Sequence, residues 1–144
     1  EKADKNLYFT EPDIREFIRC KAAAHTMVAT LLEYCGLGLD DIDHIYLAGG
    51  FGTHIVLESA VTVGIYPDVD RKKMVLLGNT SLAGAKKLLL DAGQMARVRH
   101  FLESSEYLHF SEMERFPENM VAAEFIPHTD GRLYPSVKRH PLQK

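Results

Sequence analysis

The residues best suited to bind a ligand are the glycines that follow an apolar run at residues 44–48. These are Gly49, Gly50 and Gly52, with Phe51 between them. Glycines at the end of a strand let backbone N–H groups approach a ribose, base or phosphate without a Cβ in the way. The spacing fits neither a phosphate-binding loop ending in Gly-Lys-Ser/Thr nor a dinucleotide fingerprint. On the residues alone, a plain tight turn is therefore favoured over a nucleotide site.

A second polar group follows the next apolar run, at residues 73–78. Asn79, Thr80 and Ser81 come directly after Gly78 and before a helical pattern. Carboxyl ends of parallel strands share one edge of a sheet, and helix N-termini favour anions and polar groups. A helix cap is the more common role for any one of these residues. Two glycine-bearing strand ends together still favour a cleft more than either does alone.

Other polar residues make weaker candidates. The seven histidines show no spacing typical of a metal site. His25 falls on an apolar helix face and is expected to be a core or interface group. His128 and Asp130 fit either an acid–base pair or a surface turn. Lys21, near the same apolar stripe as His25, is expected either to extend to solvent or to face a nucleotide held by another segment.

The elements that must position these residues alternate between helix and strand. A helix is expected from Thr10, a cap followed by Pro12, to a stop at Gly36. We expect further helices at 82–91, 93–103 and 117–125. Strands are expected at 44–48, 73–78 and 107–110, and a loose tail at 131–144. Residues 55–65 fit helix or strand. This order predicts an α/β fold with parallel strands, with one domain at 1–130.

Composition narrows the class of protein. The chain has 144 residues, enough for one modest core, and a formal net charge of −3, so neither nucleic acid nor a membrane is expected as a partner. No run approaches the ~20 apolar residues of a membrane span. Cys20 and Cys35, expected at the two ends of one helix, predict free thiols and a cytoplasmic protein. The charged start without Met suggests a piece of a longer chain.

Several motifs, in order, resemble the C-terminal region of the reductive activators of corrinoid proteins. These belong to the sugar kinase/actin/heat-shock chaperone ATPase superfamily. The motifs are IYLAGGFGTHI at 45–55, LESA at 57–60, Gly64, Pro67, LLGNTSLAGA at 76–85 and AAEFIPH at 122–128. As an ordered set they are specific, whereas the glycine run alone is not.

The resemblance implies an actin-like, RNase H-like ATPase subdomain with a mostly parallel sheet flanked by helices. The glycine run would be the adenosine motif, the helix at 81–90 one of two crossing helices, and 55–65 a short helix. Val56 stands where the family has an Asp that caps the short helix. Losing this cap would cost ~1 kcal/mol of helix stability, which puts the conformation of the glycine run in question. The two phosphate hairpins, the first crossing helix and the iron–sulfur domain of the family match no segment here.

The implied function is ATP-dependent reduction of a Co(II) corrinoid to Co(I), for methyl transfer or O-demethylation. ATP with Mg²⁺ would be bound at Gly49, Gly50, Phe51, Gly52, Asn79, Thr80 and Ser81. A [2Fe-2S] cluster would lie in an N-terminal domain of the parent protein. Partners would be a corrinoid protein, the remaining half of the ATPase domain and, in one alternative, a second copy. The chain alone is expected to be inactive. The competing hypotheses are a docking or dimerisation module and an activator of another metalloenzyme.

Overall fold

A computed structural model describes residues 8–137. Its longest element is helix α1 (Glu11–Cys35), which begins and ends as the sequence predicts. Thr10 caps the first turn reciprocally with Asp13: the Thr10 amide donates to the carboxylate at 2.8 Å, and the Thr10 hydroxyl accepts from the Asp13 amide. Gly36 ends the helix in the left-handed region, at φ 67°, which costs a glycine little.

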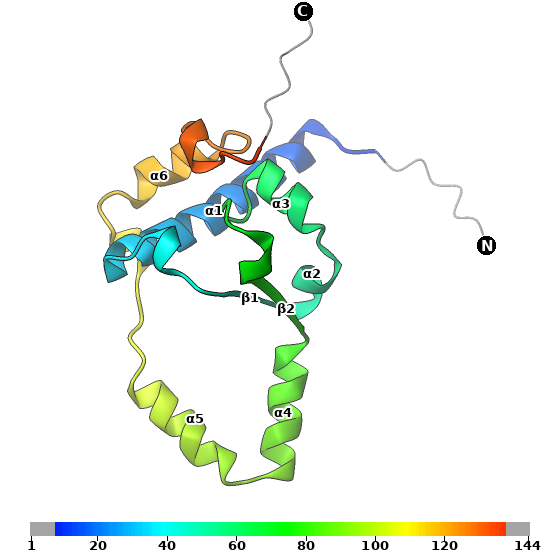
Figure 1. Cartoon of the computed structure of the whole chain (residues 1–144), viewed down its shortest axis with the longest axis vertical. Coiled ribbons are helices and arrows are strands. Elements are labelled where there is room, and N and C mark those ends of the chain that lie inside the picture. The colour runs from blue at the N-terminus through cyan, green and yellow to red at the C-terminus, as the bar shows by residue number, and fades with distance from the viewer. Residues whose placement is uncertain (1–7, 138–144) are drawn as a thin grey trace, which may run out of the picture.

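The remaining elements follow in the predicted alternating order (Figure 1). They are β1 (Ile45–Ala48), α2 (Gly49–His54), α3 (Leu57–Val63), β2 (Met74–Gly78), α4 (Thr80–Leu90), α5 (Gln94–Glu103) and α6 (Phe116–Ala123), with short 3-10 helices between some of them. Helix α3 agrees with the short helix implied by the resemblance. Its N-cap is Val56, whose side chain makes no capping bond.

The sheet of the described part of the chain is two-stranded and parallel. Ile45 pairs with Met74, and Ala48 pairs with Gly78 after an irregularity in register. The apolar runs at 44–48 and 73–78 are typical of buried strands, but in this chain Tyr46 is 61% exposed and Leu76 and Leu77 are about half exposed. Two strands alone leave both sheet faces short of neighbours, and α4 and α5 extend away from the sheet rather than over it (Figure 1).

The core lies where α3, β2 and the C-terminal segment meet. Val61, Met74 and Tyr134 are its buried members. Partly buried residues surround them: Ile45, Leu47, Leu57, Tyr66, Val69 and Val137. The core is small, and many large apolar side chains elsewhere are exposed.

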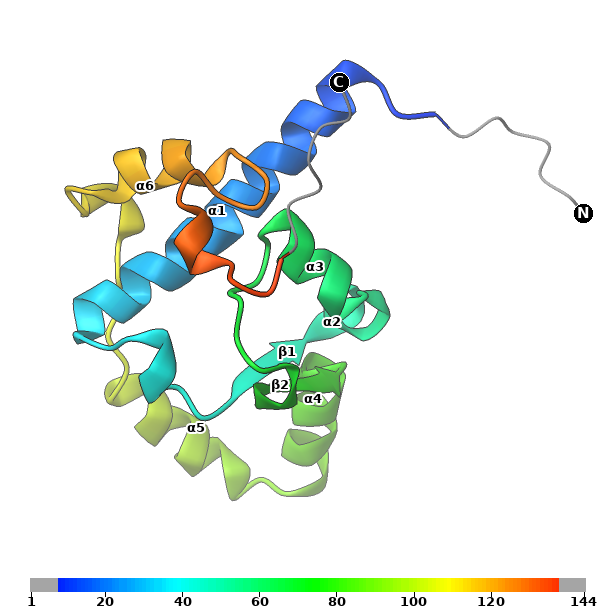
Figure 2. The same cartoon turned by 45° about the horizontal axis from the view of Figure 1, so that its top comes forward.

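Helix α6 packs along α1, where small residues let the two helices approach. Ala22 of α1 and Ala123 of α6 are both fully buried. Figure 2 shows the C-terminal segment continuing from α6 across α1 toward α3. The loose tail predicted from Gly131 is therefore wrong as far as Val137, because Tyr134 is only 3% exposed and belongs to the core. Residues 138–144 of that predicted tail lie outside the described part.

Two further expectations need correction. Residues 107–110 do not form a strand: a 3-10 helix (Phe110–Glu112) begins there, and no partner strand is available among residues 8–137. Cys20 lies in the middle of α1 rather than at an end, while Cys35 is its last residue. Both thiols are free, as predicted. Within residues 8–137, no helix is long and apolar enough to cross a membrane.

Candidate nucleotide site at the strand ends

The two polar strand ends predicted from the sequence come together. Because Ala48 pairs with Gly78 in a parallel ladder, Gly49 and Asn79 leave the sheet at the same edge. Helix α2 begins directly after β1, and α4 begins two residues after β2. The carboxyl edge of a parallel sheet is where ligands of α/β proteins bind. The geometry therefore places all seven candidate residues around one edge.

The glycine run is the beginning of helix α2, not the tight turn that the residues alone favour. Gly49 has φ 90°, a conformation that L side chains rarely adopt, and the Thr53 hydroxyl donates to its carbonyl at 2.9 Å. A Cβ on Gly49 or Gly50 would have no heavy atom within 4 Å. Gly52 instead lies against the strand, since a Cβ there would be in ordinary contact with the backbone of Leu47, at 3.4 Å. The two leading glycines thus present bare backbone to open space.

Phe51 extends the same surface with an aromatic ring. Its side chain is 69% exposed although it lies between glycines at a sheet edge. An exposed ring beside bare backbone can pack against a flat apolar group such as a nucleobase. In the isolated chain it packs against little else.

The second strand end carries the predicted cap. The Asn79 side-chain oxygen accepts from the Leu82 amide at 2.9 Å, so Asn79 is the N-cap of α4. Thr80 and Ser81 form the exposed first turn of that helix. Amides in a first helical turn have no partner within the helix, so this end can donate hydrogen bonds to a polar ligand. Capping and ligand binding are compatible here.

The groups at this edge are suited to binding a ligand. Residues 8–137 contain no cluster of three His, Cys, Asp or Glu side chains that could hold a metal ion. The bare glycine backbone, the exposed ring and the capped helix fit a nucleoside. A magnesium ion would have to be held by phosphates and by protein outside this part of the chain. The two free thiols, 15 positions apart on one helix, do not fit an iron–sulfur cluster.

Lys21, one of the weaker candidates, is neither solvent-directed nor near this edge. It is 2% exposed, and its ammonium donates to the carbonyls of Ala123, Phe125 and Pro127 at 2.5 Å each. Burial lowers the pKa of Lys21 to about 8, so the amine is still mostly charged at neutral pH. Lys21 therefore holds the end of α6 and the residues after it.

The histidine candidates are structural as well. His25 Nδ1 lies 2.9 Å from the Tyr134 hydroxyl, and burial, with smaller effects from His128 and Lys21, lowers the pKa of His25 to about 4. His128 Nδ1 accepts from the Asp130 amide at 2.9 Å, a local contact within a half-buried turn. The carboxylate of Asp130 is bound by the exposed Arg132. The acid–base alternative for His128 and Asp130 thus finds no support in the geometry.

The sequence interpretation missed the contacts of the C-terminal segment. Tyr134 falls in the predicted loose tail, and no pattern in the sequence marks Asp68 or Arg71. The one sign of these contacts in the sequence is Lys21 within the apolar stripe of a helix. A buried lysine requires hydrogen-bond acceptors from elsewhere in the chain.

Comparison with known proteins agrees with this fold. The model of a protein family described as the C-terminal domain of RACo, the ASKHA domain, matches residues 1–138. A solved structure of a reductive activator for corrinoid, iron–sulfur protein superposes with a TM-score of 0.84 at 43% identity, over 90% of this chain and 20% of that one.

Two curated relatives carry related descriptions. A Methanosarcina barkeri Co(II) methylated amine-specific corrinoid protein reductase is 29% identical over 127 residues, which is 87% of this chain and 23% of the relative. The corrinoid activation enzyme RamQ of Eubacterium limosum is 31% identical over 87 residues, or 60% of this chain and 15% of the relative. The chain thus spans less than a quarter of each of these proteins.

The fold and these matches define an ASKHA, or actin-like, domain. More particularly, the chain belongs to the family of RACo C-terminal ASKHA domains, matched over nearly its whole length. The α/β class and the resemblance to corrinoid activators are therefore confirmed.

Proposed function

We propose that the complete protein carrying this chain uses ATP to reduce an inactive Co(II) corrinoid to Co(I) on a partner corrinoid protein. The restored corrinoid would serve methyl transfer, for example O-demethylation. The relatives described as activators or reductases of corrinoid proteins support this function. The observation that carries the nucleotide part is the shared strand edge, where Gly49 and Gly50 have open space at their Cβ positions.

In this proposal the chain forms the adenosine wall of the cleft. Gly49, Gly50, Phe51 and Gly52 would pack against base and ribose, and Asn79, Thr80 and Ser81 would donate hydrogen bonds from the neighbouring strand end. Mg²⁺ would be held mainly by the phosphates and by the other wall. Nucleotide can change the arrangement of the domains only if it binds one arrangement more tightly than another. The two arrangements would hold the corrinoid protein differently.

The other wall would come from the remaining half of the ATPase domain. Within residues 8–137, β1 pairs on one side only, and the C-terminal end of α4 is bare, with Leu89 86% and Leu90 89% exposed. Exposed apolar area of this kind marks an interface. The electron would come from a [2Fe-2S] cluster in an N-terminal domain, and the free thiols suit a cytoplasmic protein.

The test is Co(II)-to-Co(I) conversion on a corrinoid protein, followed by absorbance with reductant, with and without ATP. The informative variant is Gly50→Val, because Gly50 has an ordinary backbone conformation and room for a side chain. The variant should fold and bind ATP poorly. Gly38→Val is the matched control: its Cβ would meet only Asp41, at an ordinary 3.5 Å, and Gly38 precedes β1 whereas Gly49 follows it.

We expect reduction to require ATP and to fail in folded Gly50→Val while Gly38→Val behaves as the parent. If ATP makes no difference, or Gly50→Val equals the parent, the nucleotide role is wrong. The exposed faces of α1 and α4 would then favour a docking or dimerisation module. ATP binding without any corrinoid reduction would instead favour an activator of another metalloenzyme.

A further inference from the structure

The chain from the last residue of α6 onward is held at three places, and we call residues 123–137 the C-terminal strap. The first fastening is Lys21 of α1, whose ammonium binds the carbonyls of Ala123, Phe125 and Pro127. Gly64, which ends α3, lies against the same point: a Cβ there would overlap the Pro127 carbonyl oxygen and stand 3.0 Å from the Lys21 ammonium. The strap therefore contacts Lys21 of α1 and the C-terminal end of α3 at the same place.

The second fastening is Tyr134. Its hydroxyl lies 2.9 Å from His25 Nδ1 of α1 and 3.4 Å from the Gly64 carbonyl at the end of α3. The ring is buried against Val61 of α3 in the core. One side chain of the strap thus bridges both helices.

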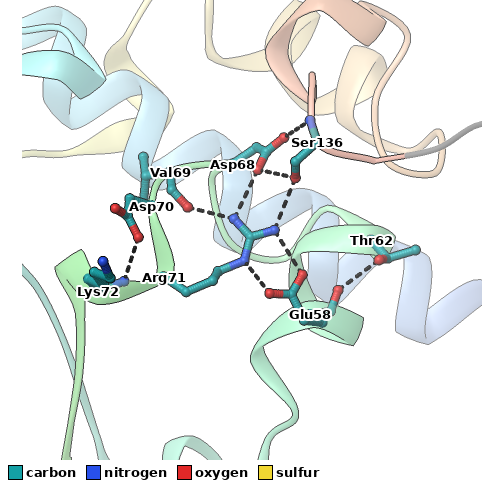
Figure 3. Close-up of polar contacts among 8 residues, drawn as sticks. All are labelled: Glu58, Thr62, Asp68, Val69, Asp70, Arg71, Lys72 and Ser136. Carbon is teal, nitrogen blue, oxygen red and sulfur yellow. Dashed lines mark hydrogen bonds and ion pairs between the residues drawn. The ribbon is translucent and has the colours of Figure 1, made fainter.

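The third fastening is a chain of charged and polar groups (Figure 3). Ser136 donates from its amide and its hydroxyl to the Asp68 carboxylate, at 2.7 and 2.6 Å. Arg71 joins that carboxylate, at 2.9 Å, to Glu58 in the first turn of α3, which it contacts twice at 3.0 Å. The Asp68 side chain is 3% exposed, so this network is shielded from solvent at its centre.

These contacts hold a helix that has little stability of its own. Helix α3 has seven residues, and Val56 gives it no side-chain cap. The strap network contacts α3 at Glu58 near its start and at Gly64 at its end. Only Ile55 and Val56 separate α3 from α2, which contains the glycine run. Whatever fixes α3 also limits the movement of the glycine run.

We propose that the C-terminal strap is a brace that positions the nucleotide-binding glycines through α3, with Asp68, Tyr134 and Ser136 as positioning residues that do not touch the nucleotide. The inference rests on the proposed ATP site. Loosening the strap leaves the fold in place and lets α3 and α2 sample orientations that bind nucleotide less well. Because such a population shift lowers the apparent affinity, ATP binding weakens without any change at the strand edge itself.

The test uses the complete protein with Ser136→Ala, which removes only one hydroxyl, and Asp68→Ala, which breaks the whole third fastening. The control is Arg132→Ala, since Arg132 belongs to the strap but pairs only with its neighbour Asp130 on the surface. Calorimetry gives the affinity for Mg²⁺ and ATP, and amide hydrogen exchange reports on residues 49–64. We expect affinity to fall about fivefold in Ser136→Ala, further in Asp68→Ala, and exchange to rise at 49–64 but not in α5.

The possible outcomes distinguish failure of the proposed brace from failure of the proposed ATP site. Faster exchange at 49–64 with unchanged ATP affinity overturns the brace, as does an equal loss of affinity in Arg132→Ala. Unchanged exchange at 49–64 in folded Ser136→Ala and Asp68→Ala also overturns it. If the parent itself binds no ATP, the proposed function has failed, and the exchange data alone decide whether the strap holds α3.

Discussion

Replacing Lys21 by Met tests how the end of α6 is held. Methionine has nearly the same length and no charge, so the change removes three hydrogen bonds to carbonyls and leaves the apolar stem in place. A hydrogen bond to a charged group contributes about 1.5–3 kcal/mol, and each buried carbonyl left without a donor costs about 1–3 kcal/mol. Burial of the ammonium, which lowers its pKa to about 8, offsets part of the gain. We therefore expect a net loss of about 3 kcal/mol.

The assay is amide hydrogen exchange in the complete protein, read on peptides covering residues 119–129. A loss of about 3 kcal/mol raises local opening by about a hundredfold, since tenfold corresponds to about 1.4 kcal/mol. The Thr129 amide, bonded to the Ala122 carbonyl, lies in this segment and should lose its protection. Lys72→Met, at an exposed position, is the control and should change nothing. Unchanged exchange at 119–129 in Lys21→Met would refute the reasoning that these carbonyls depend on the lysine.

Three further predictions concern stability, read by urea unfolding of the 144-residue chain or by exchange in the complete protein. Gly64→Ala should destabilise by more than about 2 kcal/mol, because φ is 83° and the Cβ overlaps the Pro127 carbonyl; a stable variant would contradict this close approach. Val56→Asp should stabilise α3 by about 1 kcal/mol by supplying the missing cap, seen as slower exchange at 57–63, and no change would mean that the cap is not limiting. His25 stays neutral in the fold because its pKa is lowered to about 4, whereas the unfolded chain takes up the proton near 6.5, so stability should fall by about 2 kcal/mol as pH drops from 6.5 to 4. His25→Asn should flatten that dependence, and an equally steep loss in the variant would assign it to other groups.

Local signals in the sequence determined most of the elements and the candidate site. Thr10, Pro12 and Gly36 bound the first helix because caps and stops depend on nearby backbone groups. Apolar runs ending in glycine or Asn79 located both strands, and the parallel order followed from the helix between them. The family followed from motifs in sequence order. All of these depend on residues close in the chain or on topology that chain order alone constrains.

Tertiary structure decided what depends on distant partners. Residues 107–110 have strand-like composition, but a strand exists only where another strand can pair with it. The sequence could not assign Lys21, because its three acceptors lie about 100 residues away. Tyr134 and Ser136 read as a tail because nothing nearby in the chain binds them, whereas Gly64, His25 and Asp68 do so in the fold. Neighbouring residues determine the local conformational preferences of the backbone, but burial and long-range hydrogen bonds exist only once the chain is folded.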